Sequence, residues 1–203
     1  MTRYNQTVVL ICVIALLAVS GFSQNCGELR SRSSAELLKF LEEKDVAEPD
    51  QCIVVAIDTL GSQRYEQSIP VLVKFLGFEW PVTARGKRNI EARKRGWEAN
   101  FPSERALANF GDKAFPALLA SLKGNSTSMA AKEGAVAVWM EYYSNTPETG
   151  VALLKMEADN TKDPFERRNL GYAAFLAQQR WCEDSHRARC KAAALARYAN
   201  APQ

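Results

Sequence analysis

The residues best suited to bind a charged partner are six basic side chains between Arg85 and Arg95. They are Arg85, Lys87, Arg88, Arg93, Lys94 and Arg95, and Trp80 and Trp97 flank them. With Glu91 as the one acid among them, this basic segment carries a local charge of about +5, whereas the whole chain of 203 residues carries +3. Cationic groups bracketed by aromatic rings suit a carboxylate-rich or phosphate-rich partner, or a polysaccharide. We predict that these eight residues contact a partner. The alternative is a solvated loop whose tryptophans pack onto neighbouring helices.

The cysteines are the second set of residues with chemical potential. Cys12 belongs to the N-terminal targeting segment described below, so four cysteines remain: Cys26, Cys52, Cys182 and Cys190. An even number in an exported chain favours disulfides. Four cysteines allow three pairings, and we favour Cys26–Cys52 with Cys182–Cys190, because each bond would tie together the first or the last helices. A zinc site is the alternative, but the chain lacks Cys-x-x-Cys spacing and has a single histidine.

The sequence contains no recognisable catalytic constellation. It has no Gly-x-Ser-x-Gly, no His-Glu-x-x-His and no phosphate-cradling glycine loop. His186 lies near Arg187 and Arg189 and is predicted to be a surface residue. Two of the 23 acidic side chains could meet across a groove, as in glycosidases, but nothing singles out a pair. We therefore expect no enzymatic activity, no cofactor and no metal.

The N-terminus reads as a signal peptide. Arg3 supplies the positive start, and the apolar core of 12 residues runs from Val8 to Val19. Gly21 and Ser23 are small residues at positions −3 and −1, which predicts that residues 1–23 are removed. The apolar run is shorter than the roughly 20 residues of a membrane span, although an uncleaved anchor is an alternative. A lipidation signal is not expected, because the residues directly before the first mature cysteine are not small.

The mature chain, residues 24–203, is predicted to be one exported domain, periplasmic or secreted. Its length of about 180 residues fits a single domain with a real core. Its net charge is about +2 after the loss of Arg3. A charge so near zero provides no global field for nucleic acid or an anionic membrane, so we expect neither as a partner.

Two segments of the mature chain share the pattern Pro-x-Leu-x-x-x-Leu. The pattern residues are Pro70, Leu72 and Leu76 in the first copy, and Pro116, Leu118 and Leu122 in the second. The two prolines are 46 residues apart (116 − 70). Each copy has apolar residues at i, i+3, i+4 and i+7, which predicts a helix with one buried stripe. The stripes are Ile69, Leu72, Val73 and Leu76, and Phe115, Leu118, Leu119 and Leu122.

The turns around these copies are also predicted by residue type. Each proline comes one position after the first stripe residue, where a first-turn proline lacks no needed N–H group. Gly61 and Gly111 follow Leu60 and Phe110, and both glycines are expected to end the preceding helix in the left-handed conformation.

These features resemble HEAT-like repeats of the short bacterial kind, in which an Ala-x-x-x-Leu-Gly helix end leads to a Pro-x-Leu-x-x-x-Leu helix. The first copy matches at Ala56, Leu60, Gly61, Pro70, Leu72 and Leu76, and the second keeps Gly111, Pro116, Leu118 and Leu122. The match covers about residues 50–123, and its 46-residue spacing is within the roughly 40–47 of such repeats. The resemblance implies an all-α fold, a right-handed α-solenoid of antiparallel helix pairs. It implies a scaffold or binding surface and names no ligand.

The rest of the chain is predicted from helix signals. A capping box at Ser33 and Glu36 opens the first mature helix. An insertion over about residues 77–101 interrupts the pattern without an apolar stripe, and such a long connection is either functional or disordered. The helix over 130–143 is expected to bury Ala135, Val138, Trp139 and Tyr142.

Three further helices are predicted before the C-terminus. One starts at Pro147 and turns Val151, Leu154 and Ala158 inward, and one runs from Asp163 to Arg180 with Leu170, Ala173, Ala174 and Ala177. A final helix, from about Asp184 to Tyr198, is expected to cap the array. A tetratricopeptide array is the alternative fold, and the missing 34-residue repeat argues against it.

Taken together, these features predict a non-catalytic interaction module for a protein or peptide partner, with an acidic ligand conceivable at the insertion. The alternative is an enzyme, or an enzyme accessory subunit of the cell envelope, whose site the sequence does not reveal. The sequence does not distinguish a purely structural role in the cell envelope from the interaction module.

Overall fold

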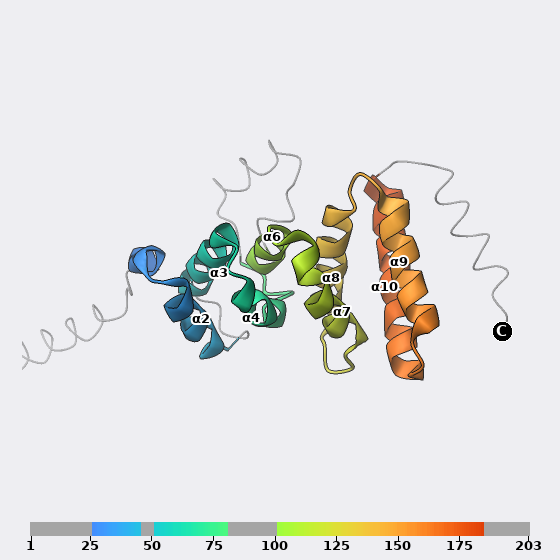
Figure 1. The fold of residues 1–203 in the computed structure, drawn as a ribbon, viewed down its shortest axis with the longest axis horizontal. Helices are drawn as coiled ribbons and strands as arrows, with labels where there is room; N and C mark the ends of the chain where they lie inside the picture. The colour runs from blue at the N-terminus through green and yellow to red at the C-terminus, as the bar shows by residue number, and fades with distance from the viewer. Residues whose placement is uncertain (1–25, 46–50, 81–100, 185–203) are drawn as a thin grey trace, which may run out of the picture.

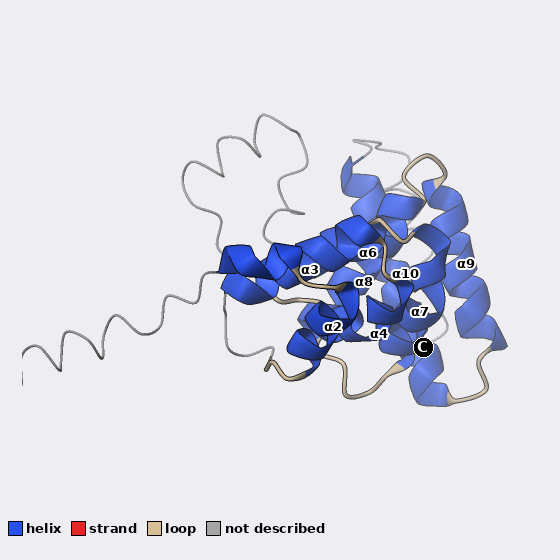
Figure 2. Cartoon of the chain, turned by 60° about the vertical axis from the view of Figure 1, so that its left-hand side comes forward, coloured by secondary structure: helices blue, strands red, loops and turns tan. Residues whose placement is uncertain are grey.

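The computed structural model describes residues 26–45, 51–80 and 101–184, and the regular structure within these ranges is all helical. The described α-helices are α2 (Ser34–Glu42), α3 (Gln51–Gln63), α4 (Ile69–Lys74), α6 (Pro102–Ala108), α7 (Phe115–Lys123), α8 (Met129–Tyr142), α9 (Pro147–Asn160) and α10 (Pro164–Asp184). Short 3-10 helices are η1 (Cys26–Ser31), η2 (Glu66–Ser68) and η3 (Gly111–Ala114). Figure 2 shows these helices joined by short loops, and the predicted all-α class is confirmed for the described residues.

The helices follow one another along the longest axis of the molecule in chain order, from α2 at one end to α9 and α10 at the other (Figure 1). Helix α3 packs against α2 and α6, and α6 packs in turn against α8. On the other side, α4 packs against α7, and α7 against α10. Helices that are two or three places apart in the described order are therefore neighbours in space.

The predicted helix starts agree with the structure. Ser33 is the N-cap of α2. The backbone N–H group of Ser33 donates to Glu36 Oε2 at 2.9 Å, and the backbone N–H group of Glu36 donates to Ser33 Oγ at 3.4 Å. The hydrogen bonds from Ser33 lower the pKa of Glu36. Pro70 and Pro116 both lie in the first turn of their helices, α4 and α7, where no intrahelical hydrogen bond is lost.

The two glycines predicted to end helices behave differently. Gly111 has φ +61°, as predicted. For Gly61 the prediction was wrong, because α3 continues through it and Arg64 takes the left-handed conformation instead, with φ 51°. A Cβ atom at Gly61 would lie 2.6 Å from the Cβ atom of Ala106 on α6. Gly61 therefore permits the close approach of two helices, and does not serve as a cap.

The predicted stripes form most of the core. Leu72, Leu118 and Leu122 are fully buried, and so are the leucines at the centres of α9 and α10, Leu154 and Leu170. The other inward residues predicted on these last two helices are buried as well: Val151, Ala158, Ala173, Ala174 and Ala177.

One stripe prediction on α8 was wrong. Ala135, Val138 and Trp139 are buried, but Tyr142 is 49 % exposed. Tyr142 is the last residue of the helix, at the end of the predicted stripe. Its ring lies edge-on to the Phe115 and Tyr143 rings at the surface.

Candidate functional site

Of the eight residues predicted to contact a partner, Trp80 alone lies within the described residues. Its side chain is half-buried and packs against the hydrophobic core. For Trp80 the structure therefore agrees with the alternative interpretation, in which the ring packs onto neighbouring helices. The other seven lie outside the described residues, and their role stays a prediction: Arg85, Lys87, Arg88, Arg93, Lys94, Arg95 and Trp97.

The segments on either side of residues 81–100 are tied to each other. Before this range, Phe78 is buried and its ring meets the ring of Phe75 edge-on, with centroids 6.1 Å apart. After it, the hydroxyl of buried Ser103 donates to the carbonyl of Leu72 in α4. The first turn of α6 is thus fastened to α4, and the chain leaves and returns at nearly the same place.

Glu104, the next residue of α6, is a buried carboxyl group at this junction. It is 2 % exposed, and its Oε1 accepts a hydrogen bond of 3.3 Å from the backbone N–H of Gly77. Its Oε2 has no hydrogen-bond partner among the described residues. Burial raises the pKa of Glu104 to about 7, although the N–H groups of Gly77 and of Glu104 itself and the charge of Arg180 favour the ionised form.

Gly134 makes room for this carboxyl group, and Gly77 makes room for the start of α8. A Cβ atom on Gly134 of α8 would overlap Oε1 of Glu104. Gly77 has φ +79°, and a Cβ atom there would lie 2.9 Å from Ala130 at the start of α8. Sequence analysis missed Glu104, because an acid in the first turn of a helix is an ordinary N-terminal residue. The sequence did contain one sign of a close contact here, because Gly134 is a glycine in the middle of an alanine-rich helix.

A second cluster is aromatic and joins the start of α7 to the end of α8. It consists of Phe115, Trp139, Tyr142 and Tyr143, with Phe115 and Trp139 centroids 4.5 Å apart. The indole N–H of Trp139 donates to the carbonyl of Gly150 at 2.9 Å, which satisfies its buried polar atom. Burial, with the neighbouring Tyr142 and Asp112, raises the pKa of Tyr143. Trp139 is therefore core, as predicted for an aromatic stripe, while Tyr142 reaches the surface.

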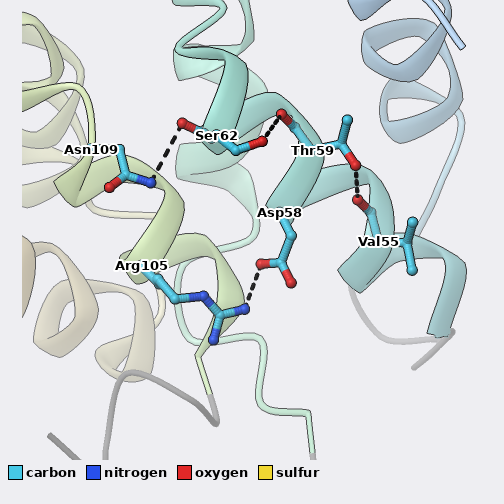
Figure 3. Close-up of polar contacts among 7 residues, drawn as sticks. Val55, Asp58, Thr59, Ser62, Arg105 and Asn109 are labelled. Atoms are coloured by element: carbon cyan, nitrogen blue, oxygen red, sulfur yellow. Dashed lines mark hydrogen bonds and ion pairs between the residues drawn. The ribbon is translucent and has the colours of Figure 1, made fainter. Parts of the chain in front are cut away.

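The seam between the first and second repeat copies carries a set of polar contacts. They join Asp58 to Arg105, Glu66 to Lys113, and the carbonyl of Gly61 to the side-chain amide of Asn109. The partners are separated by 47, 47 and 48 residues. Figure 3 shows the first and third of these contacts, beside the hydroxyls of Thr59 and Ser62, which bond back to carbonyls of their own helix. Residues 47 or 48 positions apart in the sequence thus contact each other across the seam.

One predicted disulfide is present. Cys26 and Cys52 are bonded, with Cα atoms 4.9 Å apart, and the bond ties η1 to α3. Cys182 lies buried in the last turn of α10 and is also disulfide-bonded. Cys190 lies outside the described residues, as do the predicted signal peptide and final helix, so the Cys182–Cys190 pairing stays a prediction. A structural disulfide is compatible with an exported protein.

The described part of the chain brings together no group of three or more His, Cys, Asp or Glu side chains that could hold a metal ion. None of its helices is long and apolar enough to cross a membrane. The packing order defines an all-helical protein that is compatible with a helical repeat fold. Comparison with protein-family models, curated proteins and solved structures finds no match for this chain.

Proposed function

We propose that this chain is an exported, non-catalytic interaction module built from HEAT-like repeats in a right-handed α-solenoid. The observation that carries the proposal is the set of seam contacts 47 or 48 residues apart. In a stacked array each repeat contacts its neighbour through equivalent positions, so side chains meet at about the repeat period. The spacing of 46 residues between Pro70 and Pro116 in the sequence supports the same period.

The stacking supplies a reason for a binding role. Helices as short as α4 and α6 cannot bury an apolar stripe alone, so successive pairs are joined into an extended surface. Insertions in such arrays gather on one face, often the binding face. We therefore propose a protein or peptide partner, contacted through the basic segment Arg85–Arg95.

Affinity capture from the native exported fraction tests this proposal. Replacing Arg93, Lys94 and Arg95 by alanine is expected to reduce capture while leaving stability nearly unchanged, because exposed charges contribute little to folding. A matched control replaces three exposed basic residues of the N-terminal end by alanine, namely Arg30, Arg32 and Lys39. Capture by the unaltered chain is expected to weaken as ionic strength rises.

If both triple variants capture the partner as well as the unaltered chain does at low salt, the basic segment is not the contact. The stacked helical faces would then be tested instead. Loss of capture in both variants to the same extent would indicate a dependence on net charge alone and would also contradict the assignment.

One observation supports a second candidate function, which is an enzyme or an enzyme accessory subunit. Glu104 is a buried carboxyl group with a raised pKa, and such groups occur at active sites as well as in structural networks. Its Oε1 is held by the backbone at Gly77, and the backbone of Gly134 lies against it. These contacts favour a role within the fold over contact with a substrate.

A further inference from the structure

Glu104 lies where three separate parts of the chain meet. Its own helix, α6, contacts the turn after α4 through the hydrogen bond to Gly77, and contacts α8 at Gly134. The contact at Gly134 requires the absence of a side chain there, and at Gly77 the backbone N–H group itself bonds to the carboxyl group. The carboxyl group is therefore fitted into the junction by backbone on two sides.

We propose that Glu104 is a proton-operated latch, which holds α6 against the Gly77 turn and α8 when it is protonated and loosens this junction when it loses its proton. The latch spans 27 residues of sequence and joins the segments on either side of residues 81–100. It is independent of whether the protein binds a partner.

The two protonation states have different needs in this environment. A protonated carboxyl group is neutral: its carbonyl oxygen accepts from the Gly77 N–H, and its hydroxyl is one unpaired donor, which costs less to bury than a charge. A carboxylate places charge on both oxygens, and each calls for donors. Here the bond from Gly77 is long at 3.3 Å, and Oε2 has no partner among the described residues. An ionised Glu104 is thus poorly compensated in the closed junction and better solvated in an open one.

Few charges near the junction change this balance. The charged side chains on the elements packed around α6 are Asp58 on α3, Lys74 on α4, Asp112 and Lys113 on η3, and Lys132, Glu133 and Glu141 on α8. Arg180 lies on α10, which packs against α8. Asp58 pairs with Arg105 of α6 itself, and Lys113 pairs with Glu66. Lys74 and Asp112 are exposed.

The charges on α8 point away from Glu104 or lie far along the helix. Lys132 and Glu133 precede Gly134 by two residues and one, so they lie about 160° and 100° from it around the helix. Glu141 follows Gly134 by seven residues (141 − 134), about 10 Å further along the helix axis. The positive charge of Arg180 does reach Glu104 and favours ionisation, but burial outweighs it and raises the pKa of Glu104 to about 7. The proton is therefore exchanged near neutral pH.

Hydrogen–deuterium exchange of the full mature chain tests the latch. Exchange is measured at pH 6 and pH 8, corrected for the intrinsic rate, in peptides from residues 72–78 and 101–108 and in a control peptide from α9. If the carboxyl group has its ordinary pKa of 4.5 in the open junction and about 7 in the closed one, linkage predicts that opening becomes about tenfold more frequent from pH 6 to pH 8. The α9 peptide is expected to show no such change.

The variant that isolates the proton is Glu104→Gln, which keeps the shape of the side chain and cannot ionise. We expect it to abolish the tenfold change in the two junction peptides. An equal change in Glu104→Gln, or no change in the unaltered chain, would overturn the proposal. If Glu104→Gln does not fold, ¹³C NMR of the Glu104 carboxyl carbon in the unaltered chain decides, and a titration near pH 4.5 would overturn the latch as well.

Discussion

Replacing Gly61 by alanine tests the tightest contact between the two repeat copies. An alanine Cβ atom at this position would lie 2.6 Å from Cβ and 2.7 Å from Cα of Ala106. The second distance involves backbone, so the clash cannot be relieved by turning a side chain. Helices α3 and α6 would have to move apart, and the core residues buried between them would lose contact.

The expected size of the effect follows from two opposing contributions. In a helix interior alanine is more favourable than glycine by about 1 kcal/mol. Overpacking of a close contact costs about 1–3 kcal/mol, and we take about 3 because backbone is involved. The net loss of unfolding free energy is then about 2 kcal/mol. For a chain of this size, this loss lowers Tm by about 4–8 °C.

Gly171 of α10 is a matched control for the same substitution. It also lies within a helix, but a Cβ atom there would meet nothing within 4 Å. Gly171→Ala is therefore expected to raise stability by about 1 kcal/mol and Tm by about 2–4 °C. Thermal and urea unfolding followed by circular dichroism measure both variants.

We expect the unfolding free energy to fall in Gly61→Ala and to rise in Gly171→Ala. Adding Ala106→Gly to Gly61→Ala should restore only part of the loss, because the Cα atom of residue 106 stays 2.7 Å from the added methyl group. If Gly61→Ala stabilises the protein as much as Gly171→Ala does, then α3 and α6 are not closely packed, and the explanation of Gly61 is wrong.

Three further variants test the core, the disulfide and the buried carboxyl group. Leu118→Ala is expected to reduce the unfolding free energy by about 2–5 kcal/mol in urea titrations, because a fully buried leucine leaves a cavity; a loss below 1 kcal/mol would contradict its place in the core. Replacing Cys26 and Cys52 together by serine should cost about 3 kcal/mol, since their bond closes a loop of sequence separation 26; an unchanged Tm would mean that the loop is held by packing alone. For Glu104, a pKa raised from 4.5 to about 7 means that this group binds its proton more tightly in the folded protein, so its contribution to stability is complete below about pH 4.5 and is lost as pH rises through 7. Glu104→Gln should remove that fall and gain up to about 3 kcal/mol over the unaltered chain at pH 8, and equal pH profiles of the two proteins would refute the raised pKa.

Most of the helical architecture was predictable from local signals. The capping box at Ser33 and the first-turn prolines Pro70 and Pro116 mark helix starts through hydrogen bonding and φ, which depend on near neighbours alone. The stripe leucines at Leu118 and Leu122 are buried because a period of 3.6 residues places them on one face. These inferences needed no knowledge of the partner helix.

The misses arose where tertiary contacts override local signals. Gly61 has the sequence context of a helix cap, but its reason lies in Ala106, which is 45 residues away (106 − 61). Tyr142 falls on the predicted stripe of α8, yet it is half exposed at the last residue of the helix. Glu104 looked like an ordinary first-turn acid, because the backbone that buries it comes from Gly77 and Gly134. No local pattern contains such information.

The repeating and non-repeating features of the chain have different physical roles. Leu72 and Leu118, which are 46 residues apart (118 − 72), are both buried, and polar pairs 47 residues apart join one copy of the pattern to the next. Buried side chains are not available to a partner. What differs between the copies is the site of Glu104, the aromatic cluster that ends at Tyr142, and the insertion between α4 and α6. Glu104 and Trp139 of the aromatic cluster are buried parts of the fold, so we expect substitutions in the basic segment Arg85–Arg95 to change function more than they change stability.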